Sequence, residues 1–200
     1  MTTEESMRLF VALELPEAWK QALAELQDEM GTALAERLGE SVRPRWVKPE
    51  GIHLTLKFIG ATPHRRVEAV ESALRHAVPS ALDFKLELAY VGSFADRRSP
   101  RVILAGVQGE TKPLIQLAER VETWLAAAGW PRERRSFHPH LTLARLPETM
   151  DDATRRAVAE VTTSFSAPPV DAWTAGSVSL MRSHLGPGGA RYERIASFPA

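Results

Sequence analysis

A four-residue word, His-Leu-Thr-Leu, occurs twice in the sequence, at residues 53–56 and again at residues 140–143. A chain with only six histidines is expected to contain such a word by chance far less than once. In a β-strand, side chains two positions apart point to the same face, so each copy presents His and Thr on one side and two Leu on the other. A single strand histidine is usually structural, but two copies in matching contexts favour a catalytic interpretation.

Two such strands lying together would offer two imidazoles and two hydroxyls to one substrate. Imidazole titrates near pH ~6.5, so one ring can be neutral while the other is protonated at neutral pH. The neutral ring would take a proton from an attacking water, and the charged ring would give one to a departing oxygen. Threonine hydroxyls can bond phosphate oxygens while charge builds on them. The candidate residues for phosphate-ester chemistry are therefore His53, Thr55, His140 and Thr142.

Other common catalytic motifs are absent from the sequence. It contains no Gly-rich phosphate loop, no HExxH zinc motif, no GxSxG nucleophile motif and no cysteine. The lack of cysteine excludes disulfides, cysteine-ligated metals and a cysteine nucleophile. His138 and His140 form a His-Pro-His pair, but two histidines without a third ligand are a poor metal site.

Around the two words the sequence resembles the two-histidine (2H) phosphoesterases, and within them the bacterial and archaeal RNA 2′,3′-cyclic phosphodiesterases, once called 2′-5′ RNA ligases. The resemblance covers nearly the whole chain. It includes RLFVAL at 8–13, RWV at 45–47, PEGIHLTLKFIG at 49–60, FHPHLTLAR at 137–145, LMRS at 180–183 and the last strand, which contains Tyr192.

The resemblance implies that the chain opens a nucleoside 2′,3′-cyclic phosphate at an RNA 3′ end and leaves a 2′-phosphate. It implies no metal and no cofactor, and RNA 3′ ends or cyclic nucleotides as the substrate. By the same resemblance, His53 is the proton donor to the 3′ oxygen and His140 is the proton acceptor that activates water, while Thr55 and Thr142 hold the phosphate. The two words are too alike for the sequence itself to assign the donor and the acceptor.

Arg145 and Phe10 are further candidate substrate contacts. Strand parity places residues 140, 142 and 144 on one face, so Arg145 lies on the other face unless the strand ends or bulges. Its alternative role is a surface ion pair. Phe10 could stack on a base, as aromatic residues do in RNA sites, or could simply pack in the core.

Strands and helices mix along the chain, with hairpins as well as crossovers. Expected strands are 7–15, 52–59, 83–91, 101–107, 140–146, 172–182 and 191–198, the last two joined by a hairpin turn at 186–189. Expected helices are 16–39, 63–78, 113–128 and a helix capped by Asp152 that runs to about 161, with a loop at 92–100. We predict an α+β fold of two pseudo-symmetric lobes of antiparallel sheet flanked by helices, with the active-site cleft between them. Residues 1–200 would form this single two-lobed domain, built by internal duplication.

Composition narrows the class of protein. The 200 residues include 25 basic and 25 acidic side chains, so the zero net charge excludes a strongly basic nucleic-acid-binding surface. The acidic first residues and the absence of a long apolar run predict a cytoplasmic protein that does not enter a membrane. We expect a monomer, although these features do not themselves indicate the oligomeric state. Two other enzymatic activities remain as alternatives: 2′-5′ RNA ligation and hydrolysis of another small cyclic phosphate. A third alternative, of a different class, is RNA-end binding without turnover.

Overall fold

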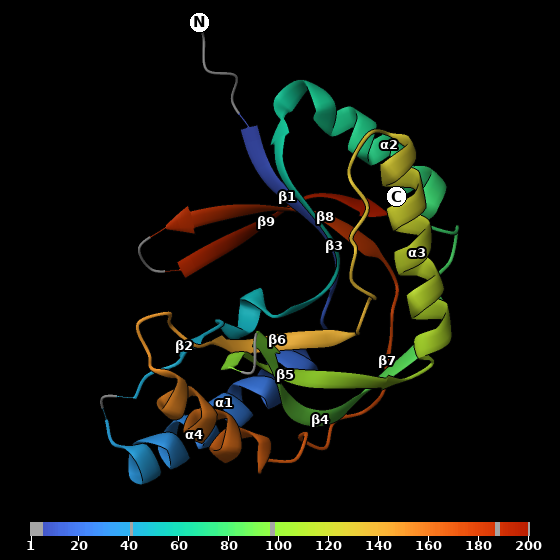
Figure 1. Cartoon of the computed structure of the whole chain (residues 1–200). Coiled ribbons are helices and arrows are strands. Elements are labelled where there is room, and N and C mark those ends of the chain that lie inside the picture. Colours follow the sequence, from blue (N-terminus) through green and yellow to red (C-terminus); the bar gives the residue numbers. More distant parts are fainter. Residues whose placement is uncertain (1–5, 41, 97–98, 187–188, 200) are drawn as a thin grey trace, which may run out of the picture.

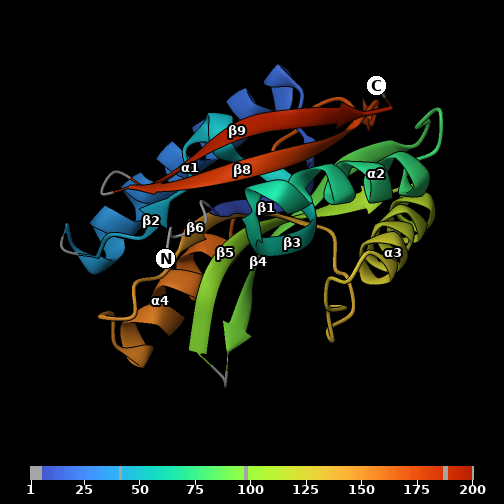
Figure 2. The same cartoon turned by 90° about the horizontal axis from the view of Figure 1, so that it is seen from above.

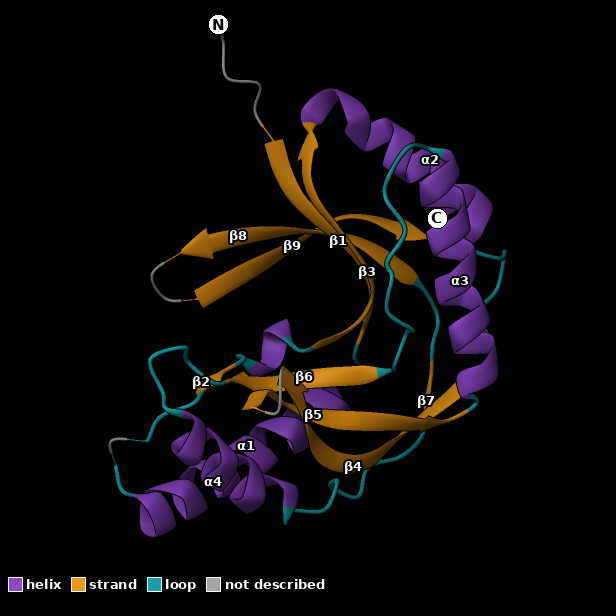
Figure 3. Cartoon of the chain, viewed as in Figure 1, coloured by secondary structure: helices purple, strands orange, loops and turns teal. Residues whose placement is uncertain are grey.

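The computed structural model describes residues 6–40, 42–96, 99–186 and 189–199. Within them, one nine-stranded sheet has the strand order β7-β4-β5-β6-β3-β1-β8-β9, with β2 paired to β6 (Figures 1 and 3). All of the strand pairs are antiparallel. The predicted α+β class is therefore confirmed.

The elements have the following bounds. The strands are β1 (Ser6–Glu14), β2 (Arg45–Trp46), β3 (His53–Pro63), β4 (Lys85–Asp96), β5 (Ser99–Gly109), β6 (His140–Arg145), β7 (Trp173–Thr174), β8 (Val178–Gly186) and β9 (Gly189–Phe198). The helices are α1 (Glu17–Leu38), α2 (Val67–Ala77), α3 (Thr111–Ala127) and α4 (Asp152–Thr163), with the 3₁₀ turns η1 (Pro49–Gly51) and η2 (His64–Arg66).

Helix ends follow local chemistry. Helix α1 stops before Gly39, whose φ of 88° lies in the left-handed region that favours glycine. At the start of α4, the predicted cap is displaced by one residue: the Asp151 carboxylate accepts hydrogen bonds from the backbone N–H groups of Ala153 and Thr154. Asp152 instead accepts a hydrogen bond from Arg155.

Two predicted boundaries of the sheet are wrong. The expected loop at 92–100 is largely strand, because β4 and β5 keep pairing as far as the Asp96–Ser99 pair. The expected strand 172–182 is broken between β7 and β8, which belong to opposite ends of the sheet. The predicted hairpin between the last two strands is present, with Gly186 paired to Gly189. Its turn residues 187–188 lie outside the described residues.

The sheet has a narrow centre. Strands β3 and β6 are joined, within the described residues, by the single pair Leu54–Leu141. On one side of this pair lie β3, β1, β8 and β9, and on the other side lie β6, β5, β4 and β7. The predicted two lobes are thus two parts of one sheet, each with four strands on the main path and β2 added beside β6, and they are related by approximate two-fold symmetry about the Leu54–Leu141 pair.

Each half of the chain contributes to both parts of the sheet. Strand β4 of the first half pairs with β5 of the second, and β8 of the second half pairs with β1 of the first. The helices follow the same exchange. Helix α3 of the second half packs on β3 and α2, whereas α1 of the first half packs on α4 and donates a hydrogen bond from Gln27 to the carbonyl of Leu143 in β6 (Figures 1 and 2).

One large apolar core lies between the sheet and these helices, and it includes the four leucines of the two repeated words. A separate small cluster on the opposite face contains Phe10, Ala12 and Met181, with Tyr192 packed against it. In the described part of the chain, no helix is both long enough and apolar enough to cross a membrane.

Candidate active site

The two repeated words meet at the centre of the sheet. Because Leu54 and Leu141 are paired antiparallel, His53 lies beside Thr142 and His140 lies beside Thr55. The leucines face the main core, so the two histidines and two threonines share the other face of the sheet. We call this face, which carries His53, Thr55, His140 and Thr142, the motif face. All four of its defining side chains are partly exposed.

Both motif strands bulge just after the word. Residue pairing skips Leu56 between β1 and β3, and skips Leu143 between β5 and β6. The six residues from each histidine onward then share one burial pattern, with the fourth and fifth buried and the sixth exposed. The bulge in β6 is stabilised by groups that do not belong to β5. The Leu143 carbonyl accepts hydrogen bonds from the Val47 backbone N–H and from the Gln27 side chain.

These bulges decide where Arg145 lies. An unbroken strand would turn Arg145 away from His140, but the extra residue reverses the parity after Leu143. Arg145 pairs with Val102 and Thr142 pairs with Leu104, so both belong to the motif face. By the same reversal Phe58, the symmetric counterpart of Arg145, joins the motif face from β3. The site therefore has an exposed guanidinium in one lobe and an exposed ring in the other.

Each motif histidine is held by a backbone carbonyl two residues earlier, in the segment that leads into its strand. The Nδ1 of His53 lies 2.7 Å from the Gly51 carbonyl oxygen, and the Nδ1 of His140 lies 2.8 Å from that of His138. A carbonyl only accepts, so both Nδ1 atoms donate a hydrogen. Both rings are thereby fixed in one tautomer, with Nε2 left to exchange a proton with a ligand.

Both imidazoles favour the neutral form in the empty site. Burial is the largest cause, and it lowers the pKa of His53 from 6.5 to about 4. The pKa of His140 is also lowered, again mainly by burial. The Arg145 guanidinium, which the bulge in β6 places on the motif face, lowers the pKa of both rings. A negative charge beside the rings favours their protonation, and a bound phosphate supplies one.

This electrostatic state predicts a pH-dependent stability. Between pH 4 and 6.5 the unfolded chain binds more protons at His53 than the folded chain, so folding is weakened as pH falls. Above pH 6.5 the titration of His53 takes nothing from the free energy of unfolding. On acidification to pH 4 it lowers this free energy by about 3 kcal/mol. We expect His53→Gln to flatten this part of the curve, measured as the free energy of unfolding in urea at successive pH values.

His64 provides the control for this measurement, since its side chain is exposed in η2. His64→Gln should reproduce the wild-type curve between pH 4 and 6.5. Identical curves for His53→Gln and the wild type would contradict the lowered pKa of His53.

Aromatic rings surround His53. Phe10 is only 2% exposed, and its ring centroid lies 4.7 Å from that of His53. The Tyr192 ring meets His53 edge-on at 5.0 Å. The ring available to a ligand in this lobe is Phe58, which is 68% exposed and 6.1 Å from Phe10. Base contact by Phe10 stays a prediction, and the structure places this residue as a support for the His53 ring.

The second lobe presents aromatic rings on the same face. Phe94 meets His140 edge-on at 4.7 Å between ring centroids. Tyr90, which is half-exposed, lies over Gly106, the residue paired with His140. A side chain at Gly106 would approach Tyr90 within 2.2 Å, so glycine is needed for this packing. The sequence alone did not identify Phe58, Tyr90 and Phe94, because their exposure beside the polar site is visible only in the structure. Exposed rings in such a place are typical of rings that stack on bases.

A buried ion pair ties the two motif segments together. The Lys57 ammonium, directly after the first bulge, lies 2.6 Å from Glu122 of α3 and donates to the Pro131 carbonyl at 3.0 Å. Pro131 begins the segment that leads to His140. Arg66 holds the end of α3 just before this segment, donating to the Ala128 carbonyl and covering the Trp130 ring at 4.0 Å.

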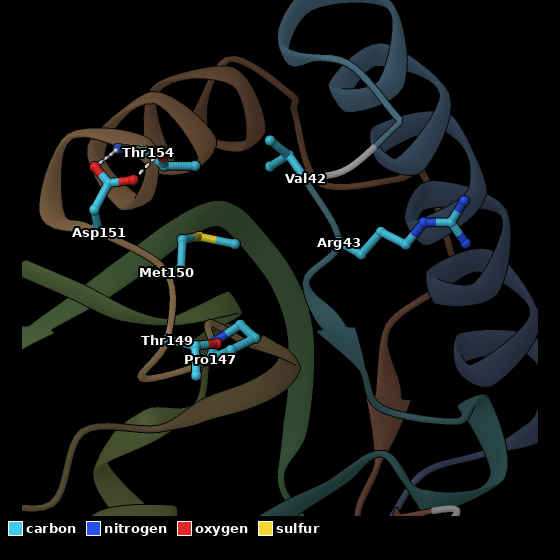
Figure 4. A pocket seen from close by; sticks show the side chains of 7 residues that line it. All are labelled: Val42, Arg43, Pro147, Thr149, Met150, Asp151 and Thr154. Carbon is cyan, nitrogen blue, oxygen red and sulfur yellow. Dashed lines mark hydrogen bonds between the residues drawn. The ribbon is translucent and has the colours of Figure 1, made fainter.

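A second concave region of the described surface lies away from the motif face. A hollow of about 360 Å³ lies beside the start of α4 (Figure 4), and its lining residues are Val42, Arg43, Pro147, Thr149, Met150, Asp151 and Thr154. Its one carboxylate, Asp151, is already occupied by the helix cap and the Thr154 hydroxyl. Among residues that the structure describes, no group of three or more His, Asp or Glu side chains is arranged to hold a metal ion.

Comparison with protein families and curated proteins gives concordant matches. The model of the 2′-5′ RNA ligase superfamily matches residues 13–187. An RNA 2′,3′-cyclic phosphodiesterase of Geobacillus stearothermophilus is 29% identical over 198 residues, which cover 95% of this chain and 56% of that protein. The chain thus spans little more than half of that relative. A second such phosphodiesterase, from Methanothermobacter thermautotrophicus, is 27% identical over 96% of this chain and 98% of its own length.

Solved structures show the same fold. The crystal structure of TT0787 of Thermus thermophilus aligns with a TM-score of 0.71 and 28% identity, covering 96% of this chain and 97% of that one. Escherichia coli LigT in its apo form aligns with a TM-score of 0.68 and 25% identity, covering 97% of each chain.

Proposed function

Because the chain belongs to the 2′-5′ RNA ligase superfamily, we propose that it hydrolyses 2′,3′-cyclic phosphodiesters at RNA 3′ ends to 2′-phosphomonoesters. The matched relatives named RNA 2′,3′-cyclic phosphodiesterase support a phosphoesterase activity at the level of the family. The observation that carries the specific proposal is the pairing of the two words across Leu54 and Leu141, with both Nδ1 atoms held by carbonyls.

In the proposed reaction, water attacks the phosphorus atom and loses a proton to Nε2 of His140. The P–O3′ bond breaks, and Nε2 of His53 gives its proton to the departing O3′. The products are a 3′-hydroxyl and a 2′-phosphate, so one water has been added. The proton on His140 then returns to His53 through solvent, which completes the cycle.

Binding of the phosphate is the proposed role of Thr55, Thr142 and Arg145. The two hydroxyls flank the histidines on the motif face, where they can donate to non-bridging oxygens. Arg145 brings a full positive charge to a chain with no net charge. The phosphate would raise the pKa of a histidine that is neutral in the empty site, so the substrate itself prepares the proton donor.

We expect the purified protein to open adenosine 2′,3′-cyclic phosphate and RNA ends in the presence of EDTA, since two imidazoles and a guanidinium provide the chemistry. Phosphorus NMR of the products should show the 2′-monophosphate. Formation of the 3′-monophosphate would contradict the assigned leaving group, and loss of turnover in EDTA would contradict a metal-free reaction.

Assays on further substrates separate the alternative functions. Joining of tRNA halves through a 2′-5′ bond, in preference to hydrolysis, would identify a ligase that uses the same proton transfers in reverse. Preferred turnover of a cyclic phosphate that is not a 2′,3′-ribonucleotide would change the substrate class. Tight binding of cyclic-phosphate RNA ends without product would identify a binding module.

A further inference from the structure

The approximate two-fold symmetry of the sheet makes the surroundings of the two histidines directly comparable. On β1, the residues paired with Thr55, Leu54 and His53 are Ala12, Leu13 and Glu14. On β5, the residues paired with Thr142, Leu141 and His140 are Leu104, Ala105 and Gly106. The position opposite the histidine is therefore a carboxylate in one lobe and a glycine in the other.

Glu14 is held in place on the motif face. Its Oε1 accepts a hydrogen bond from the Ser179 hydroxyl at 2.5 Å and lies 3.2 Å from Nε of Arg194. Ser179 is buried on β8, opposite Ala12 of β1, whereas the Glu14 side chain is partly exposed. Directly opposed residues of antiparallel strands have Cβ atoms about 5 Å apart, which brings the carboxylate close to the His53 ring.

The charged and titratable groups that face His53 come from three strands. Glu14 of β1 is the carboxylate among them and raises the pKa of His53, whereas Arg145 and His140 of β6 lower it. The Tyr192 phenol of β9 contacts the ring edge-on. For His140, burial lowers the pKa most, Arg145 and His138 lower it further, and Tyr90 covers Gly106 opposite the ring.

We propose that Glu14 is the positioning residue that makes His53 the proton donor, because its carboxylate stabilises the imidazolium of His53 in preference to that of His140. The proposal rests on the proposed acid–base function and explains how two nearly identical words can have different roles. Burial keeps the pKa of His53 at about 4 in the empty site even with Glu14 opposite, so the carboxylate acts together with the bound phosphate to protonate this ring. His140 then stays neutral and accepts the proton of water.

The test compares Glu14→Gln, which keeps the shape and an acceptor for Ser179, with Arg194→Gln, which leaves the carboxylate without its cation. Imidazole NMR titrations should show a lower pKa of His53 in Glu14→Gln and a higher one in Arg194→Gln, with His140 unmoved in both. On an ordinary cyclic phosphate near neutral pH, Glu14→Gln should lose three- to tenfold in turnover, because a decrease of about 0.5 to 1 in the pKa of His53 lowers its protonated fraction by that factor.

A substrate whose 3′ bridging oxygen is sulfur separates this role from general damage. The P–S bond breaks to a thiolate, which needs no proton, so Glu14→Gln should cost less than twofold on it. An equal loss on both substrates, or equal shifts at His53 and His140, would overturn the proposal. Unequal shifts in a protein that opens neither substrate would overturn the proposed function instead, with the electrostatic difference between the histidines left intact.

Discussion

Replacing either motif histidine should abolish most of the activity. We expect His53→Ala and His140→Ala each to slow the opening of a 2′,3′-cyclic phosphate at least ~10²-fold, because each removes one of two required proton transfers. The rings are partly exposed on the motif face, so both variants should stay folded. Steady-state kinetics with adenosine 2′,3′-cyclic phosphate, together with circular dichroism, measures both properties.

The two losses should differ in kind. On the substrate with sulfur at the 3′ bridging position, His53→Ala should recover much of its rate, because a thiolate leaves without a proton donor. His140→Ala should stay slow, since water must still be deprotonated. His64→Ala, in the exposed η2 turn, should match the wild type on both substrates. Full activity in either motif variant would reject the acid–base pair, and recovery in His140→Ala instead of His53→Ala would reverse the roles.

Loss of the Lys57 side chain should have the largest effect on stability. Lys57 is 4% exposed and Glu122 is 19% exposed, so Lys57→Ala leaves a nearly buried carboxylate without its cation and the Pro131 carbonyl without its donor. Such a change costs about 3–5 kcal/mol in the free energy of unfolding. Denaturation in guanidinium chloride measures this loss.

Two further variants identify the origin of that loss. In Lys57→Met/Glu122→Leu both charges are removed, so we expect much of the stability to return. Arg75→Ala breaks an exposed pair with Glu71 on α2 and should cost no more than about 0.5 kcal/mol. A Lys57→Ala variant as stable as Arg75→Ala would show that the buried pair does not hold the segment before His140.

The sequence was most informative at the repeated words. Alternation of His, Leu, Thr and Leu specifies which side of the strand each residue occupies, and the structure places both words accordingly. The family resemblance carried by the same residues is confirmed by the family match. Long periodic segments such as α1 were also predictable, because an apolar stripe and a terminal glycine act locally.

Features that depend on long-range pairing could not be predicted in the same way. The bulges at Leu56 and Leu143 have no local signature, yet they decide that Phe58 and Arg145 reach the motif face. The alternation of side chains along a strand therefore could not decide from the sequence which face Arg145 occupies. Strand extension through 92–96 depends on pairing with β5, since the sequence GSFAD is itself typical of a loop.

Glu14 is a residue that sequence reasoning missed despite an available signal. It is the single charged residue within the apolar stretch LFVALEL at 9–15, and it shares strand parity with Phe10 and Ala12. A charge at the end of a buried strand indicates a partner or a function. Which partner it has depends on strands β8 and β9, more than 160 residues away in the chain.

The exchange of strands and helices between the two halves has a consequence for the origin of such a chain. Two separate copies of one half, related by a dyad, could bury the same surfaces as a homodimer. Their histidines would then be identical by symmetry, and any mutation would alter both at once. In a single chain, glutamate and glycine are encoded independently at positions 14 and 106. The two lobes of one chain can therefore place different residues opposite their two histidines, which two identical subunits cannot do.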